Sequence, residues 1–125
     1  MFLVYGLQKS GLSVAKLLEK KNFDFRIWDD NKVIRGKLKN IFSDNLFLKP
    51  NKKNLTKFEN IFVSPGISLR QKKFKINNKS NILKRDLNLY YSNLSNQKII
   101  AITGTNGKST STKLIGDLLK KLNFK

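Results

Sequence analysis

A segment near the end of the chain combines the residue types that hold a phosphate. Residues 99–102 are apolar and predict a buried strand, and residues 110–122 repeat apolar side chains at helical spacing. Between them stands the sequence Gly104-Thr-Asn-Gly-Lys-Ser-Thr110. Glycines let a loop turn tightly, and the amides at the start of the next helix attract an anion. A lysine and a hydroxyl placed there can reach the β- and γ-phosphates of a nucleotide and a Mg²⁺ ion.

The match to the usual phosphate-binding loop is incomplete. The long form, Gly-x-x-x-x-Gly-Lys-Ser/Thr, requires a glycine where this chain has Ile102. An ordinary glycine turn capped by hydroxyls is the alternative. Such a turn does not need Lys108 at the start of a helix, where its charge opposes the helix dipole. We therefore favour phosphate binding, with Lys108 at the γ-phosphate and Ser109 as the metal ligand.

A second glycine turn lies near the start of the chain, inside a predicted strand–helix–strand unit with strands at 2–5 and 25–28 and a helix at 12–21. The turn, Gly6-Leu-Gln-Lys-Ser-Gly11, resembles the dinucleotide fingerprint Gly-x-Gly-x-x-Gly. Gln8 replaces the middle glycine, which argues against ordinary NAD binding. Asp29 ends the second strand at about the spacing of the acidic ribose ligand. A Rossmann-like turn without a ligand stays open as the alternative.

The rest of the chain predicts an α/β fold. A Rossmann-like parallel sheet is expected in residues 1–95, and residues 96–125 read as the first strand, P-loop and helix of an incomplete second domain, which buries too little apolar surface to be stable alone. Ser64-Pro-Gly-Ile67 follows a clear strand, at the edge where parallel sheets bind ligands. The remaining expected elements are a helix at 32–39, strands at 45–48, 60–63 and 82–83, a loop at 50–54, a basic helix or loop at 69–78, an amphipathic helix at 86–94 and a boundary at 92–97.

Composition narrows the class of protein. The chain has 125 residues, no cysteine, no histidine and a net charge of +18. Disulfides, thiolate metal sites and imidazole catalysis are therefore excluded from it. Most of the 26 basic residues are lysines scattered along the chain, so we expect a solvated surface and no nucleic-acid partner. No apolar run approaches the roughly 20 residues of a membrane helix, and the start lacks a signal peptide, so we expect a cytoplasmic protein that does not insert into membranes. We also expect a monomer.

The loop at 101–110 resembles the ATP loop of the Mur ligases of peptidoglycan synthesis. The match is best to the members that add D-glutamate to UDP-N-acetylmuramoyl-L-alanine. The turn at 6–12 and the segment at 64–67 also resemble that family, apart from Gln8. The residues after Asp29 are Asp30 and Asn31, where some relatives carry Thr-Arg.

The resemblance implies an amide ligation that uses ATP and Mg²⁺ and proceeds through an acyl phosphate. Its substrates are UDP-N-acetylmuramoyl-L-alanine and D-glutamate, and this chain alone is expected to be inactive because the remaining machinery lies beyond it. The resemblance implies that Lys108 is a catalytic residue and that Ser109 is a ligand of Mg²⁺. The implied UDP-sugar ligands are Lys9, Ser10, Asp29 and Gly66. The implied ATP ligands are Gly104, Thr105, Asn106, Gly107, Lys108, Ser109 and Thr110.

Two alternatives stay open. One is another ligase of the same type, adding L-alanine or diaminopimelate, or a folylpolyglutamate synthase, because the ATP loop is shared among these enzymes. The other is a Rossmann-like binding module without enzymatic activity, which would have no need of the phosphate loop.

Overall fold

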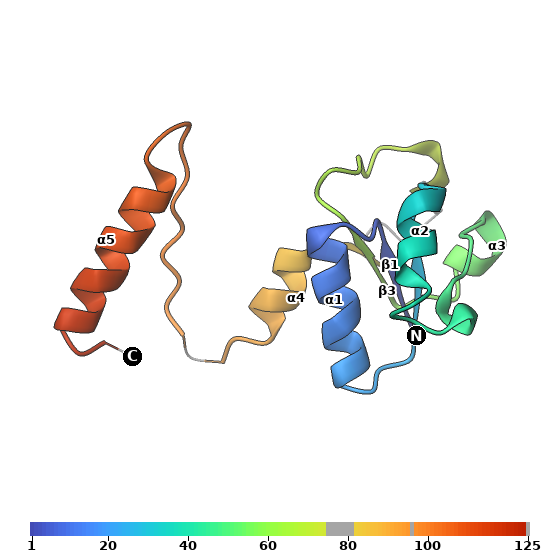
Figure 1. The fold of residues 1–125 in the computed structure, drawn as a ribbon, viewed down its shortest axis with the longest axis horizontal. Coiled ribbons are helices and arrows are strands. Elements are labelled where there is room, and N and C mark those ends of the chain that lie inside the picture. Colours follow the sequence, from blue (N-terminus) through green and yellow to red (C-terminus); the bar gives the residue numbers. More distant parts are fainter. Residues whose placement is uncertain (75–81, 96, 125) are drawn as a thin grey trace. The chain divides into compact units, whose positions relative to one another are not determined.

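The computed structural model describes residues 1–74, 82–95 and 97–124 (Figure 1). The chain forms two compact units, which divide between Leu94 and Ser95. Among the described residues, no helix is both long and apolar enough to span a membrane.

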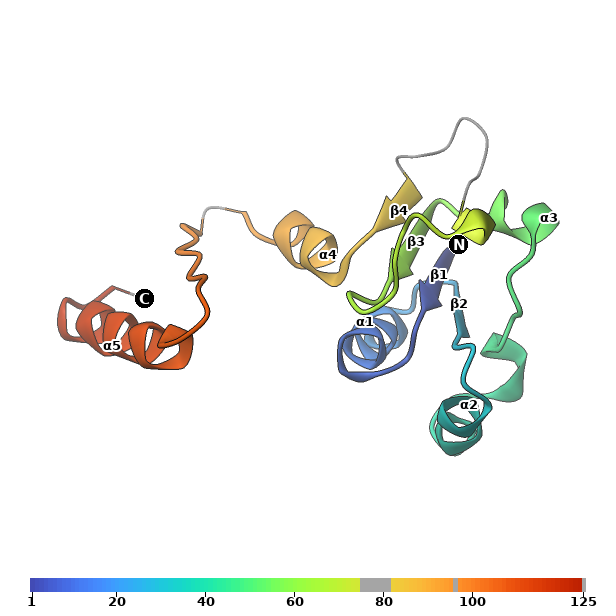
Figure 2. The same ribbon diagram turned by 90° about the horizontal axis from the view of Figure 1, so that it is seen from above.

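The first unit is built on a four-stranded parallel sheet with the order β2-β1-β3-β4. The strands are β1 (Phe2–Tyr5), β2 (Phe25–Trp28), β3 (Asn60–Val63) and β4 (Leu83–Lys84). Tyr5, the last residue of β1, is in register with Trp28 on one side and Val63 on the other. Because the strands are parallel, their carboxyl ends meet at one edge, which brings together the segments that follow them (Figure 2).

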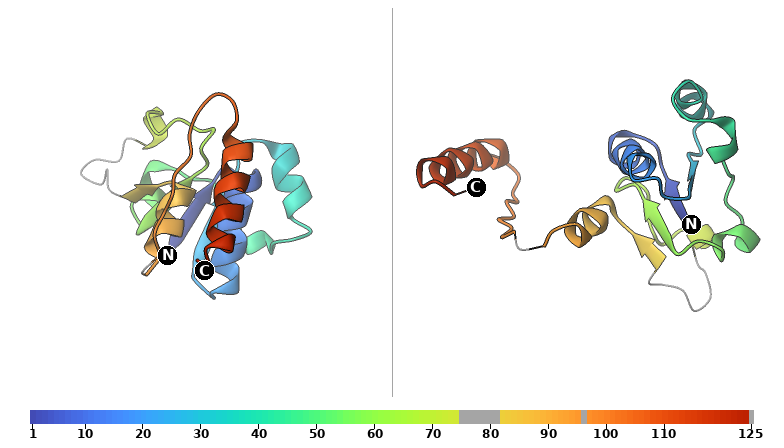
Figure 3. Two further views of the ribbon diagram at one scale, coloured as in Figure 1. Left: turned by 90° about the vertical axis from the view of Figure 1, so that its left-hand side faces the viewer. Right: turned by 90° about the horizontal axis from the view of Figure 1, so that it is seen from below.

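Helices cover both faces of this sheet. They are α1 (Lys9–Lys20), α2 (Lys32–Leu38), α3 (Lys52–Leu55) and α4 (Asp86–Ser92), with 3₁₀ turns at Asp44–Leu46 and Lys72–Phe74. Side chains alternate along β1, so Val4 packs with Leu18 of α1, and Leu3 packs with Leu55 of α3 on the opposite face. Figures 2 and 3 show α1 and α3 on these opposite sides. The sheet is therefore buried on both faces, as its continuous apolar strands require.

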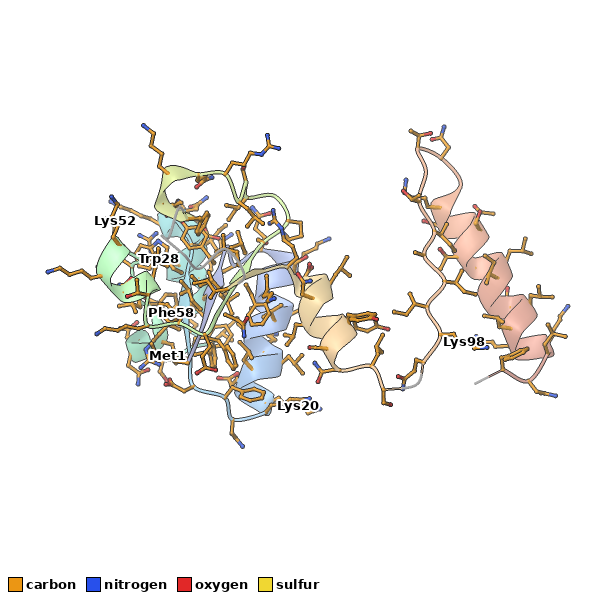
Figure 4. All side chains as sticks on the ribbon, turned by 180° about the vertical axis from the view of Figure 1, so that it is seen from behind. Met1, Lys20, Trp28, Lys52, Phe58 and Lys98 are labelled. Atoms are coloured by element: carbon orange, nitrogen blue, oxygen red, sulfur yellow. The ribbon has the colours of Figure 1, made fainter. Side chains whose placement is uncertain are left out.

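The exposure of individual side chains agrees with this arrangement of the first unit. In Figure 4, Lys20 and Lys52 point outward, whereas Phe58 lies inside the unit, where it is 2% exposed.

Several elements differ from the sequence-based prediction. The strand expected at 45–48 is wrong: the chain forms the 3₁₀ turn Asp44–Leu46, and only Phe47 makes a bridge, to Ile27 of β2. The polar residues at 43–45 favour a turn over a ladder. The loop expected at 50–54 contains α3, which begins with a capping box between Asn51 and Asn54.

Other predicted elements are present, but their ends differ from the predicted bounds. Helix α1 begins at Lys9, directly after the glycine turn, and α2 ends at Leu38. Strand β4 lies one residue later than predicted, and α4 ends at Ser92. Of the basic segment predicted at 69–78, residues 69–74 contain the second 3₁₀ turn, and residues 75–78 lie outside the described residues.

The second unit contains helix α5 (Lys108–Lys121), which starts two residues before the predicted helix. The strand predicted at 99–102 is not formed: these residues have no ladder partner in the described part of the unit. Ile99 and Ile100 are 53% and 58% exposed. An apolar strand needs neighbouring strands to satisfy its backbone, and the described residues of this unit supply none.

The contact between Gly11 and the glycine turn predicts a sharp stability difference between two Gly→Ala variants. A Cβ at Gly11 would lie 1.7 Å from the Gly6 carbonyl oxygen, whereas a Cβ at Gly36 in α2 would meet nothing within 4 Å. Gly11→Ala should lower the free energy of unfolding by about 3 kcal/mol through overpacking. Gly36→Ala should raise it by roughly 0.5–1 kcal/mol, because alanine favours the helix. Urea unfolding of the full chain measures both, and equal stability of the two variants would contradict the packing shown here.

Candidate functional site

Three segments that follow parallel strands line one hollow of about 350 Å³ at the carboxyl edge of the sheet. They come after β1, β2 and β3, and the chain leaves the central strand β1 between its two neighbours, which is where open α/β sheets form ligand crevices. The lining residues from these segments include Gly6, Gln8, Asp29, Asn31, Ser64 and Gly66. Two predicted site residues, Asp29 and Gly66, thus lie in one hollow with the glycine turn.

Gly6 brings the first and third segments into contact. Its φ of +88° favours glycine, and a Cβ there would lie 2.6 Å from Ile67 Cδ1 and 2.7 Å from Ser64 Cβ. Gly66 is different, since a Cβ there would meet nothing within 4 Å. Packing within the described chain therefore explains a glycine at position 6 and leaves open space beside position 66.

Asp29 ties the first segment to the second. Its side chain is buried, at 8% exposed. Oδ2 accepts a hydrogen bond from the Leu7 backbone N at 2.7 Å, and Oδ1 accepts one from the Asn31 backbone N at 2.8 Å. The carboxylate therefore holds the turn after β1 against the end of β2.

A second polar cluster lies beside the hollow and was missed by the sequence reasoning. Lys73 Nζ donates to Asp30 Oδ2 at 2.7 Å and to the Tyr5 hydroxyl, and Trp28 Nε1 donates to Asp30 Oδ1 at 3.2 Å. Burial alone would raise the pKa of Asp30, but the hydrogen bonds from Lys73, Tyr5 and Trp28 together lower it. No local sequence signal joins Lys73 to Asp30, because 43 residues separate them.

The pKa values of Lys73 and Tyr5 in this cluster are shifted as well. Burial would lower the pKa of Lys73, but its hydrogen bonds to Asp30 and Tyr5 raise it overall. Burial, together with hydrogen bonding to Asp30, raises the pKa of Tyr5. The cluster is therefore held in the state with a charged lysine, a charged aspartate and a neutral tyrosine.

Two arginines fix the backbone around the hollow. Arg35 Nη1 donates to the carbonyl oxygens of Asp29 and Asp30 at 2.5 and 3.0 Å, and its guanidinium lies 4.3 Å from the centroid of the Trp28 ring. Arg85 Nη1 donates to the carbonyl oxygens of Val63 and Ser64 at 3.1 and 2.6 Å. Sequence reasoning counted these two arginines only toward the net charge. Their role could not be predicted, because the fold determines which carbonyl oxygens they reach.

Lys9 and Ser10 lie in the first turn of α1 and line a separate hollow of about 350 Å³, which faces Asp86 and Tyr90 of α4. The structure therefore divides the predicted UDP-sugar ligands between two neighbouring hollows, with Gln8 at the rim of the first and Lys9 at the rim of the second.

The loop of the second unit is shaped by its glycines. Gly104 and Gly107 have φ values of +144° and +74°, and α5 begins at Lys108. Lys108 Nζ bends back to donate to the carbonyl oxygens of Gly104 and, at 3.3 Å, of Thr105. The ammonium thus lies over the loop. Among the described residues, no group of three or more acidic side chains could hold a metal ion.

Asp29→Asn tests the role of the buried carboxylate. Asparagine keeps one oxygen and turns an NH₂ group toward a backbone N–H, which then loses its acceptor. The free energy of unfolding should fall by about 1–3 kcal/mol. Asp24→Asn is the control, because that carboxylate pairs with Arg26 at an exposed position and should cost at most about 1 kcal/mol. Chemical denaturation measures both, and an equally small loss at Asp29 would contradict its tethering role.

The Asp30–Lys73 pair predicts an acid-dependent stability. Because the folded pKa of Asp30 lies below its usual 3.8, the pair stabilises the fold above that pH and loses its effect as pH falls through the folded value. Asp30→Asn should therefore destabilise the chain slightly at pH 6, and the difference from wild type should shrink below pH 3.8. Thermal unfolding across pH measures it, with Asp117→Asn as the control. A difference that does not change with pH would contradict the pairing.

Comparisons with known proteins identify the family of this chain. Residues 1–83 match the family described as Mur ligase MurD-like, N-terminal domain. The UDP-N-acetylmuramoylalanine--D-glutamate ligase of Rickettsia prowazekii (strain Madrid E) is 37% identical over 117 residues, which are 93% of this chain and 26% of the relative. The enzyme of that name from Wolbachia sp. subsp. Brugia malayi (strain TRS) is 36% identical, with 94% and 25% covered.

A relative with lower sequence identity is matched over a similar part of its length. The UDP-N-acetylmuramoylalanine--D-glutamate ligase of Caldicellulosiruptor saccharolyticus is 32% identical over 127 residues, which are 96% of this chain and 28% of the relative. The chain thus spans about a quarter of the length of these relatives. The family match, the four-stranded parallel sheet and the glycine turn together place the chain in the Mur ligase family, with a MurD-like N-terminal domain.

Proposed function

We propose that the chain corresponds to the N-terminal part of an ATP-dependent ligase that adds D-glutamate to UDP-N-acetylmuramoyl-L-alanine in peptidoglycan precursor synthesis. Residues 1–95 form the UDP-sugar domain, and residues 96–125 belong to the start of the central ATP-binding domain. They supply its P-loop and helix α5, and the apolar run at 99–102 would become its first strand once neighbouring strands are present. The observation that carries the proposal is the convergence of the glycine turn, Asp29 and Gly66 on one hollow. The names of the relatives indicate the reaction.

In this proposal the hollow at the sheet edge and the hollow between α1 and α4 hold the UDP-sugar. Asp29 acts by holding the turn, since both of its oxygens already accept backbone N–H groups. Gly66 leaves the backbone accessible, because no neighbour in the described chain fills the space beside it. Lys9 and Ser10 add an ammonium and a hydroxyl next to this site, which suit a diphosphate.

The loop at 104–110 fits ATP and Mg²⁺ by its donor set. The helix start at Lys108, the loop amides and the hydroxyls of Thr105, Ser109 and Thr110 favour phosphate oxygens. Lys108 now bonds loop carbonyls, and the same ammonium would turn to the γ-phosphate. Mg²⁺ typically needs few protein ligands beside phosphates, so the Ser109 hydroxyl suffices from this segment.

The bound ligands and the residues of this chain have different roles in the proposed reaction. ATP with Mg²⁺ would supply the γ-phosphoryl group that activates the alanyl carboxylate as an acyl phosphate, with ADP as the leaving group. The amine of D-glutamate would then displace phosphate from the acyl carbon to form the amide. Residues of this chain hold the UDP-sugar, position the phosphates and neutralise their charge, which is most of what phosphoryl transfer requires of a protein.

Calorimetric titration of the full chain tests the proposed substrate. UDP-N-acetylmuramoyl-L-alanine should bind, and NAD should not, because Gln8 stands where the dinucleotide fingerprint needs glycine. Tighter binding of UDP-N-acetylmuramate than of its alanyl form would move the assignment to an alanine-adding ligase.

Gly66→Ala sharpens this test. The added methyl group should leave stability unchanged, because it meets no described neighbour, but should weaken UDP-sugar binding about tenfold by blocking the backbone surface. Gly116→Ala in α5 is the matched control, since a Cβ there also has open space. Unchanged affinity in Gly66→Ala, with binding intact in wild type, would remove Gly66 from the site.

A further inference from the structure

A further cavity lies at the opposite end of the strands from the hollow at the carboxyl edge. Its volume of about 440 Å³ is within the usual range of small-molecule sites. Phe2 and Asn60, the first residues of β1 and β3, line it, so we call it the amino-end cavity. Among the described residues, none lines both this cavity and the hollow at the carboxyl edge. The amino-end cavity is therefore a separate candidate site.

Aromatic and aliphatic side chains form much of the wall of the amino-end cavity. Phe62 and Leu18 belong to the core, at 6% and 1% exposed, and they also line the cavity. The ring centroid of Phe2 lies 6.1 Å from that of Phe62 and 5.4 Å from that of Phe23. Because Phe23 is 46% exposed, the three rings form an apolar surface that runs from the core to solvent.

Lys84 interrupts the apolar pattern of the sheet in this cavity. It is in register with Phe62, which is in register with Val4, so the three side chains lie on the same face of the sheet. Val4 and Phe62 belong to the core on this face, whereas Lys84 is only half-buried and lines the cavity. Within the described part of the chain, the Lys84 side chain forms neither a hydrogen bond nor an ion pair. Its charge is therefore available to a ligand.

Lys21 brings a second ammonium group to the amino-end cavity. It follows α1, and its Nζ donates to Asn93 Oδ1 at 2.8 Å, in the residue after α4. The two helices lie side by side there (Figure 1). Because the Asn93 carboxamide is neutral, this hydrogen bond leaves the charge of Lys21 uncompensated. Of the lining residues that the structure describes, only Lys21 and Lys84 are ionised, so the described wall combines apolar surface with net positive charge.

We propose that the amino-end cavity binds a small amphipathic anion, a carboxylate carried on a flat aromatic body. The body lies against the rings of Phe2, Phe23 and Phe62, and the carboxylate pairs with Lys21 and Lys84. A highly charged ligand such as a diphosphate is poorly matched, because apolar walls would strip water from its charges. The proposal goes beyond the proposed ligase function, because none of the predicted UDP-sugar or ATP ligands lines this cavity.

Chemical-shift titration of the full chain with three probes tests this site. Naphthalene-2-carboxylate should bind more tightly than neutral naphthalene-2-methanol or acetate, because only the first carries both the aromatic body and the charge. Lys84→Met keeps an apolar stem and should weaken the carboxylate about fivefold, and Lys21→Met should weaken it about twofold because that side chain is exposed. Lys20→Met is the matched control, since Lys20 points outward from α1 and does not line the cavity (Figure 4).

The outcomes distinguish this site from simpler explanations. Equal affinity for the carboxylate and the alcohol would overturn the charge pairing. Equal weakening in Lys20→Met and Lys84→Met would assign binding to the overall charge of the chain and would also overturn the proposal. Shifts confined to the residues that follow β1, β2 and β3 would place the probe at the carboxyl edge, with the same consequence, and so would a wild-type chain that does not bind the carboxylate.

The position of β4 at the edge of the four-stranded sheet supplies one more discriminating outcome. An inward lysine on an edge strand also discourages pairing between sheets. If Lys84→Met dimerised in size-exclusion chromatography but bound the carboxylate as tightly as wild type, that structural role would replace the proposed one. The affinity for UDP-N-acetylmuramoyl-L-alanine should be equal in wild type and Lys84→Met, so failure of this site leaves the proposed function standing.

Discussion

The buried carboxylate of Asp29 is the contact on which the rest of the sheet-edge site depends. Its two oxygens bind backbone N–H groups that follow two different strands, Leu7 after β1 and Asn31 after β2. A buried carboxylate without partners would be costly, so the two strand ends must stay close enough to satisfy it. Gly6 then brings this assembly into contact with Ser64 and Ile67, after β3. Three loops thereby become one hollow with a defined shape.

The electrostatics of the first unit act at two ranges. The excess of lysines gives the chain a positive field that attracts anions over about the distance of a Debye length. Inside the hollow, Asp29 accepts hydrogen bonds from two backbone N–H groups, and Asp30 forms an ion pair with Lys73. The lysine surface therefore acts over a long range, whereas the acidic groups of the hollow act on their immediate neighbours.

The two glycine turns illustrate what tertiary contacts add. The turn at residues 6–11 is held by Asp29, by the Gly6–Ser64 contact and by the packing of Gly11 against the Gly6 carbonyl. The loop at 104–110 has local partners in the described chain, and its lysine folds onto its own carbonyl oxygens. Helix α5 nevertheless forms, because its apolar spacing and its glycine start are local properties.

The sequence by itself determined the α/β class, the strands β1, β2 and β3 and the glycine turns, because these depend on local apolar runs and on glycine's freedom. The segment at 45–48 and the apolar run at 99–102 could not be read correctly, since a strand requires partners that only the fold supplies or withholds. Only the tertiary structure decided that both Asp29 oxygens serve the backbone, that Lys73 pairs with Asp30, and that Lys9 and Gln8 face different hollows. These are contacts between residues far apart in the chain, or directions of neighbouring side chains, and neither has a periodic trace in the sequence.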